Sequence, residues 1–224
     1  ITITGTGPCI HGSHSTTVTL KVMNFTMDPY RFSPNGDWVK DTTTIRATFW
    51  QSLTWILEIR TPAGALVRNL GTGTGSSLSI PWDGKNNAGT VVPDGTYKVC
   101  LNGSDFKKRR DVIVDTTRPT VTCSWNPNPF NPHATPPQTS TCTYTLSEKC
   151  SMSIKIYDTS GNLVKTLLAS TTKDAGTYTI AWDGKNKVGN IVAAGTYICR
   201  IYATDIAGNN VDPSGYKTCT IQVL

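Results

Sequence analysis

Two short segments of the 224-residue chain place an indole ring beside a carboxylate, as in a catalytic acid next to a sugar-stacking residue. They are Trp82-Asp83-Gly84 and Trp182-Asp183-Gly184. The same three residues return 100 positions later, so we interpret them as one structural unit that is used twice. In this interpretation the Trp fills a core, the Asp accepts backbone N–H bonds in a turn, and the Gly adopts a positive φ.

A loop early in the first copy has oxygen-bearing side chains at a spacing that could surround calcium. Asn35, Asp37 and Asp41 would place three oxygen ligands on one tight turn, as a hard cation requires. The corresponding place in the second copy, His133-Ala134-Thr135-Pro136, has no carboxylate. We therefore favour a plain turn and keep calcium as the alternative.

Borderline metal ligands also lie close together near the N-terminus. Cys9, His11 and His14 could hold a transition metal if a fourth group came from elsewhere. Cys9 has a competing use in a disulfide, and we favour the interpretation without a metal. None of these histidines, nor His133, accompanies a nucleophile-elbow motif, and no glycine-rich phosphate loop leads into a helix. We expect no enzymatic activity and no resident cofactor.

Seven cysteines without a Cys-x-x-Cys pair predict disulfides formed in an oxidising compartment. Strand parity places inward-facing cysteines on strands that should be neighbours, and it leaves Cys150 unpaired. It places Cys100 on an outward face, free to meet the N-terminal segment. The predicted pairs are Cys199 with Cys219, Cys123 with Cys142, and Cys9 with Cys100.

The net charge of +6 contains one concentrated basic run, Lys107-Lys108-Arg109-Arg110. It follows a predicted hairpin tip and has only Phe106 as an aromatic neighbour, whereas proteins that read nucleic acids interleave such charges with stacking residues. We interpret it as a solvated hairpin that steers towards acidic polymers or an acidic partner. No nucleic-acid partner is expected.

The elements that position these residues are strands. Apolar residues alternate with polar ones at a period of two, as at Ile45, Ala47 and Phe49, and no segment keeps a helical period. No apolar run is long enough to span a membrane, and no signal pattern opens the sequence. We predict an all-β protein with two tandem immunoglobulin-like or fibronectin-like β-sandwiches, at residues 18–115 and 116–224, after an N-terminal extension at residues 1–17.

Both copies share a longer pattern that resembles a known repeat. Trp82 to Asn86 and Trp182 to Asn186 read Trp-Asp-Gly-Lys-Asn, and Gly-Thr-Tyr follows at Tyr97 and Tyr197. This combination is similar to the immunoglobulin-like repeat of flagellar hook-capping proteins and of many secreted bacterial surface proteins. The resemblance implies an extracellular or cell-surface location in a prokaryote.

The first four residues, Ile1-Thr2-Ile3-Thr4, alternate like a strand with one buried face. Such a strand needs a sheet edge, in its own chain or in a neighbouring copy. We favour donation of Ile1 and Ile3 to a neighbouring subunit, followed by self-association. Pairing within the chain is the alternative.

These observations favour a non-catalytic extracellular structural protein, a subunit or decoration of a surface appendage or filament. The alternative is an accessory module that tethers a secreted enzyme or binds polysaccharide, with Trp38, Trp50 or Trp125 stacking on sugar rings. Scaffolding of hook assembly is a third possibility, from the resemblance alone.

Overall fold

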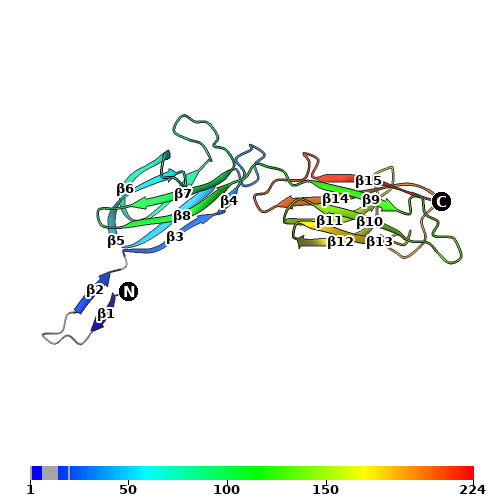
Figure 1. Ribbon diagram of the computed structural model, residues 1–224, viewed down its shortest axis with the longest axis horizontal. Coiled ribbons are helices and arrows are strands. Elements are labelled where there is room, and N and C mark those ends of the chain that lie inside the picture. The colour runs from blue at the N-terminus through cyan, green and yellow to red at the C-terminus, as the bar shows by residue number, and fades with distance from the viewer. Residues whose placement is uncertain (1, 7–14, 20) are drawn as a thin grey trace. The chain divides into compact units, whose positions relative to one another are not determined.

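The computed structural model describes residues 2–6, 15–19 and 21–224, and within these ranges it contains strands and turns but no helix. The all-β class is therefore confirmed. The chain divides after Thr116 into two compact units, called domain 1 and domain 2 below (Figure 1). This division lies one residue beyond the boundary that the sequence predicts, after Asp115. The part of the chain that the structure describes has no helix suited to crossing a membrane.

Domain 2 is a two-layer β-sandwich. One layer has the strand order β13-β10-β9 and the other has the order β12-β11-β14-β15, all antiparallel. Buried and more exposed residues alternate along β10 and β11, as expected for strands with one face on a core. The strands are β9 (Val121–Asn126), β10 (Ser140–Leu146), β11 (Cys150–Tyr157), β12 (Leu163–Lys173), β13 (Gly176–Trp182), β14 (Gly195–Asp205) and β15 (Tyr216–Val223).

Domain 1 repeats this plan with longer strands. β5 (Thr43–Arg60) and β6 (Leu66–Trp82) form one long hairpin, whereas domain 2 divides the same path among four strands. The beginning of β5 pairs with β3 (Val22–Asp28), and its end pairs with β7 (Gly95–Asn102). The pairing register shifts between Thr48 and Leu53, where the hairpin passes from one layer to the other. β8 (Lys107–Val114) follows β7, and the short β4 (Arg31–Phe32) pairs with β8 in parallel.

The N-terminal strand pairs within its own chain. β1 (Thr2–Thr6) lies antiparallel to β2 (Ser15–Thr19), with Ile3 opposite Val18, and the two strands form a sheet of their own. The structure thus shows the alternative to strand donation for Ile3, while Ile1 lies outside the described residues. Self-association stays a prediction.

Candidate functional site

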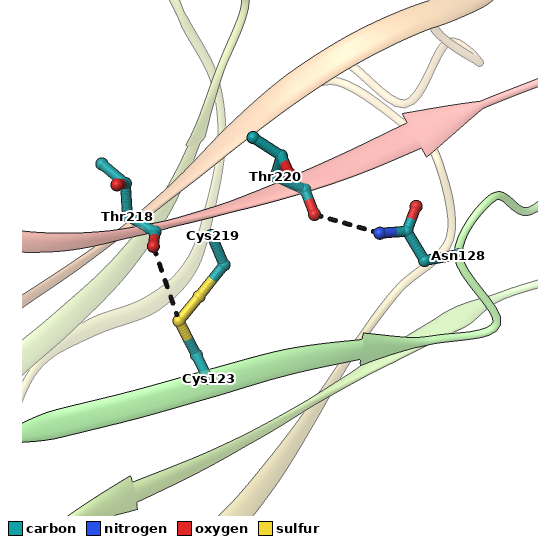
Figure 2. The surroundings of a disulfide bond; sticks show 5 residues. All are labelled: Cys123, Asn128, Thr218, Cys219 and Thr220. Atoms are coloured by element: carbon teal, nitrogen blue, oxygen red, sulfur yellow. Dashed lines mark hydrogen bonds between the residues drawn. A yellow bond between two sulfur atoms is a disulfide. The ribbon is translucent and has the colours of Figure 1, made fainter.

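A disulfide joins the first and last strands of domain 2. Cys123 lies on β9 and Cys219 on β15, separated by 96 positions in the sequence. Both strands are edges, β9 of the three-stranded layer and β15 of the four-stranded layer, so the bond connects the two layers (Figure 2). The Cα atoms lie 6.3 Å apart, a normal separation for a disulfide. The covalent loop leaves only residues 117–122 and 220–224 of domain 2 outside it.

Hydrogen bonds extend this closure along the same edge. The side-chain amide of Asn128 donates to the Thr220 carbonyl at 3.2 Å, and the Gln222 amide donates to Asn128 Oδ1 at 2.9 Å. Further along, the Phe130 amide donates to the Gln222 carbonyl and the Leu224 amide donates to the Phe130 carbonyl, each at 3.0 Å. The two ends of domain 2 are thus held together both covalently and by backbone pairing.

The predicted pairing of Cys199 with Cys219 is wrong. The two residues do lie opposite each other on β14 and β15. Because β15 is an edge strand that approaches β9, Cys219 bonds across the layers to Cys123. Strand parity identified the inward face of each strand but not the layer from which the partner would come.

The predicted pairing of Cys123 with Cys142 is wrong for a related reason. β9 and β10 are neighbours, but Cys123 lies opposite Tyr144 and Cys142 lies opposite Trp125. Cys142 remains a buried thiol, as does Cys150. Burial raises the pKa of Cys150 to about 11, which makes it a poor nucleophile at neutral pH.

The expectation of an accessible Cys100 is also corrected. Cys100 lies on the outward parity of β7, yet only 2% of it is exposed. Burial raises the pKa of its thiol, an effect that the nearby guanidinium groups of Arg109 and Arg60 oppose. The Cys9 proposed as its partner lies outside the described residues, as do His11 and His14 of the candidate metal cluster.

Domain 1 has a groove at the edge that corresponds to the disulfide-linked edge of domain 2. When the two domains are aligned on the repeated Trp-Asp-Gly motif, the strand registers place Phe25 of β3 at the position of Cys123 and Arg110 of β8 at the position of Cys219. A shallow groove of about 590 Å³ lies there instead of a crosslink. It is lined by Phe25, Thr26, Met27, Tyr30, Arg109, Arg110 and Asp111.

The groove brings part of the basic run next to aromatic side chains. Lys107 to Arg110 are exposed at the start of β8, and Tyr30, 53% exposed, lies at the same groove. The sequence showed the basic run but not the neighbouring ring, because Tyr30 is some 80 positions away in the chain. The arrangement offers cations and a stacking surface to an anionic, ring-containing ligand.

The two Trp-Asp-Gly motifs have the same surroundings. Trp82 and Trp182 are each 1% exposed. The indole N–H of Trp82 donates to the Lys85 carbonyl at 2.9 Å, and that of Trp182 donates to the Lys185 carbonyl at 3.0 Å. Each ring also packs edge-on between a Phe and a Tyr: Phe32 and Tyr97 in domain 1, Phe130 and Tyr197 in domain 2.

The Asp and Gly of each motif form the turn that follows. Asp83 Oδ1 accepts the Lys85 amide at 3.1 Å, and Asp183 Oδ1 accepts the Lys185 amide at 3.0 Å. Gly84 has a φ of 71°, and a Cβ placed there would lie 2.5 Å from Pro34. Gly184 has a φ of 72° with the equivalent approach to Pro132. Only glycine can adopt this positive φ and also fit against the neighbouring proline.

The candidate calcium loop is closed by its own hydrogen bonds. The two carboxylate oxygens of Asp41 accept the amides of Gly36 and Trp38, at 2.8 and 2.7 Å. Asn35 Oδ1 accepts the Asp37 amide at 3.0 Å, and Asp37 Oδ1 accepts the Val39 amide at 2.9 Å. The oxygens that would bind a cation are therefore engaged by backbone donors, which is the pattern of Asx turns.

Removing the Asp41 carboxylate should destabilise domain 1, while calcium should have no effect. We expect Asp41→Ala to cost about 1 kcal/mol because two backbone donors lose their acceptor. Calcium and a chelator should give the same melting temperature by calorimetry. The exposed Asp174→Ala serves as a control. A calcium-dependent rise in melting temperature that Asp41→Ala abolishes would restore the calcium alternative.

A layer of tyrosines on the outer face of domain 2 was not found from the sequence. The Arg200 guanidinium lies between two rings, 4.3 Å from the Tyr157 centroid and 4.7 Å from that of Tyr216. The hydroxyls of Tyr157 and Tyr202 lie 3.0 Å apart, and burial together with this hydrogen bond raises the pKa of Tyr157 to about 12. The sequence signal that could have revealed this layer is the position of Tyr157, Arg200 and Tyr216 on the outward-facing sides of β11, β14 and β15.

The three Trp residues considered for sugar stacking differ in exposure. Trp38 is 96% exposed and Trp50 is 59% exposed. Trp125 is 7% exposed and belongs to the core of domain 2, so its proposed role as a surface platform is wrong. An inward position on β9 explains the burial, since Val121 and Trp125 share the core-facing side of that strand.

A family model provides the most direct comparison with known proteins. The FlgD Ig-like domain model matches residues 51–105 and 133–206, one segment in each domain and together more than half of the chain. No curated protein shows detectable sequence similarity to the chain.

The solved structures that match the chain are distant from it in sequence. Latent PorU from Porphyromonas gingivalis is 12% identical with a TM-score of 0.35, over 91% of this chain and 20% of PorU. Salmonella alpha-2-macroglobulin is 10% identical with a TM-score of 0.33, over 97% of this chain and 16% of that one. Invasin, a bacterial integrin-binding protein, is 14% identical with a TM-score of 0.33, over 91% and 39%. The chain spans well under half the length of each of these proteins.

Proposed function

Because the chain belongs to the family of FlgD Ig-like domains, we propose that it is a non-catalytic extracellular structural protein, a subunit or decoration of a surface appendage or filament. The family match supports an immunoglobulin-like module in each domain. The inter-layer disulfide supports an oxidising compartment, since such bonds rarely persist in a reducing cytosol.

The observation that carries the structural role is the covalent closure of domain 2. Tension applied through Thr117 and Leu224 reaches Cys123 and Cys219 after only a few residues, and it then passes through the disulfide rather than through the 96-position loop. A sandwich closed in this way cannot be drawn out without breaking the bond. This is a useful property for a module that bears load within an appendage.

The closure also stabilises the module at rest. In the chain-entropy model, a crosslink over about 100 residues stabilises the folded state by about 4–5 kcal/mol, because it restricts the unfolded chain. The neighbouring hydrogen bonds of Asn128 keep the same two strands aligned. Domain 2 is thereby suited to persist outside the cell.

Electron microscopy of the natively purified protein tests this proposal. We expect ordered polymers, or particles attached to a surface structure, in which Cys123 and Cys219 cannot be alkylated. Monomers that show no assembly under any native condition would contradict the structural role. Thiols that react freely at both cysteines in the native protein would contradict the proposed compartment.

A second candidate function, binding of an acidic polysaccharide, is favoured by the open groove of domain 1. Arg109 and Arg110 would pair with sugar carboxylates while Tyr30 stacks on a ring. The same native material can be applied to an alginate column. Salt-sensitive retention that Arg109→Ala/Arg110→Ala abolishes would support this candidate; the exposed pair Lys187→Ala/Lys217→Ala removes the same charge from domain 2 and should leave retention unchanged.

A further inference from the structure

Two buried thiols meet in the core of domain 2. Cys142 and Cys199 are each 0% exposed and belong to the same hydrophobic core, where each thiol affects the other electrostatically. Cys142 lies on β10 in the three-stranded layer, whereas Cys199 lies on β14 in the four-stranded layer. The contact therefore crosses the sandwich from one layer to the other, as the Cys123–Cys219 disulfide does.

The fold does not need sulfur at these two positions. In the same alignment of the two domains on their repeated motifs, Ile45 and Val99 of domain 1 correspond to Cys142 and Cys199 of domain 2. Both are 0% exposed and belong to the core of domain 1. An apolar pair thus fills the same space in the sister domain, so packing alone does not explain two facing cysteines.

We propose that Cys142 and Cys199 form a second inter-layer disulfide in domain 2. The corner before Cys199 is consistent with this bond. The Tyr197 hydroxyl donates to the Ala193 carbonyl at 2.8 Å, two residues before Cys199. In immunoglobulin-like sandwiches a tyrosine corner of this kind marks the strand that carries the second cysteine of the inter-sheet bond, and domain 1 has the same corner at Tyr97 ahead of Val99.

The bond forms by thiol–disulfide exchange, which either cysteine can begin. When Cys142 reacts first, its thiolate attacks one sulfur of an external disulfide, such as glutathione disulfide, to form a mixed disulfide and release one thiolate. The sulfur of Cys199 then loses its proton and attacks the sulfur of Cys142. The new bond forms, a second external thiolate leaves, and two protons and two electrons have passed to the oxidant.

The burial of the two thiols determines the stage of folding at which this exchange can occur. With no exposed surface, neither sulfur is accessible to an external disulfide in the folded domain. The bond must therefore form while β10 and β14 are closing around the core. Protein folded in the presence of a reductant should keep both thiols.

Oxidative refolding of the full chain tests the proposal. Reduced, unfolded protein is refolded with a mixture of glutathione and glutathione disulfide, unfolded again without reductant, and alkylated with iodoacetamide. We expect loss of alkylation at Cys142 and Cys199 together with a peptide that links them. Cleavage after Trp125 or Phe130 separates Cys123 from Cys142, so the two crosslinks give distinct peptides.

A parallel refolding with reductant should give full alkylation at both residues. The Cys142→Ile/Cys199→Val variant carries the residues of domain 1; it should fold, retain the Cys123–Cys219 peptide and lose the second crosslink. Protein that contains Cys123–Cys219 but alkylates fully at Cys142 and Cys199 would overturn the proposal. A peptide that links Cys199 to Cys219 would overturn it as well. The first result would leave the Cys123–Cys219 closure, on which the proposed function rests, intact, whereas the second would contradict that closure as well because it uses Cys219.

Discussion

Stretching the oxidised chain from both ends is expected to extend domain 1 fully but domain 2 only in part. The 96 positions inside the Cys123–Cys219 loop, at ~3.4 Å each, correspond to about 33 nm of chain that the applied force cannot extend. The force passes through the disulfide, so the strands inside the loop carry no tension even after their hydrogen bonds break. Domain 1 has no crosslink among its described residues and extends over its length. One chain thus contains both the protected module and its unprotected counterpart.

Single-molecule force spectroscopy measures this difference. The experiment uses the full chain with a handle at each end in a Cys100→Ser background, which excludes a bond from Cys9. We expect one long unfolding event in oxidising buffer and a second event of similar length after a reductant is added. The Cys123→Ser/Cys219→Ser variant, combined with Cys142→Ile/Cys199→Val so that no second crosslink can form, should show both lengths without reductant. Two full-length events in oxidised protein would show that domain 2 is not protected in this way.

Much of the fold could be predicted from the sequence because the signals were local. Alternating apolar residues gave the strands, and the repeat of Trp82 at Trp182 gave two copies of one sandwich. Each motif depends on contacts within a few residues, such as the bond from the Trp182 indole to the Lys185 carbonyl. Features of this kind can be recognised before the chain is folded.

The disulfide could not be predicted because it depends on how the two layers meet. Parity placed Cys123 and Cys219 on inward faces, but both sit on edge strands 96 positions apart. The register of neighbouring strands favoured Cys199 as a partner, whereas the bond crosses between layers. The groove of domain 1 was missed for the same reason, since Tyr30 and Arg110 approach only when the edges come together.

The edge formed by the first and last strands of each sandwich has diverged between the domains. In domain 2 a pair of cysteines seals it, and in domain 1 Phe25 and Arg110 leave an open, basic groove. The cores themselves have changed far less, since Trp82 and Trp182 keep the same aromatic neighbours and the same hydrogen bond. The two edges therefore differ in what they present: a crosslink between the layers in domain 2 and an open groove with exposed arginines in domain 1.

Replacing Trp182 by Ala is expected to destabilise domain 2 by about 3–5 kcal/mol, a large share of the ~5–15 kcal/mol that holds a typical domain folded. The substitution removes a ring that is 1% exposed, leaves a cavity between Phe130 and Tyr197, and deprives the Lys185 carbonyl of its donor. Urea denaturation followed by tyrosine fluorescence or circular dichroism should show an earlier midpoint for domain 2 with domain 1 unchanged.

Trp82→Ala should have the same effect on domain 1, because Trp82 has the same burial and the equivalent bond to Lys85. The matched control is Trp50→Ala, which removes an indole that is 59% exposed and should change the stability of domain 1 by less than about 0.5 kcal/mol. If Trp182→Ala or Trp82→Ala kept the wild-type midpoint but abolished binding to a polysaccharide column, these indoles would be ligand platforms rather than core residues. The buried T-shaped packing of both rings leads us to expect the loss of stability.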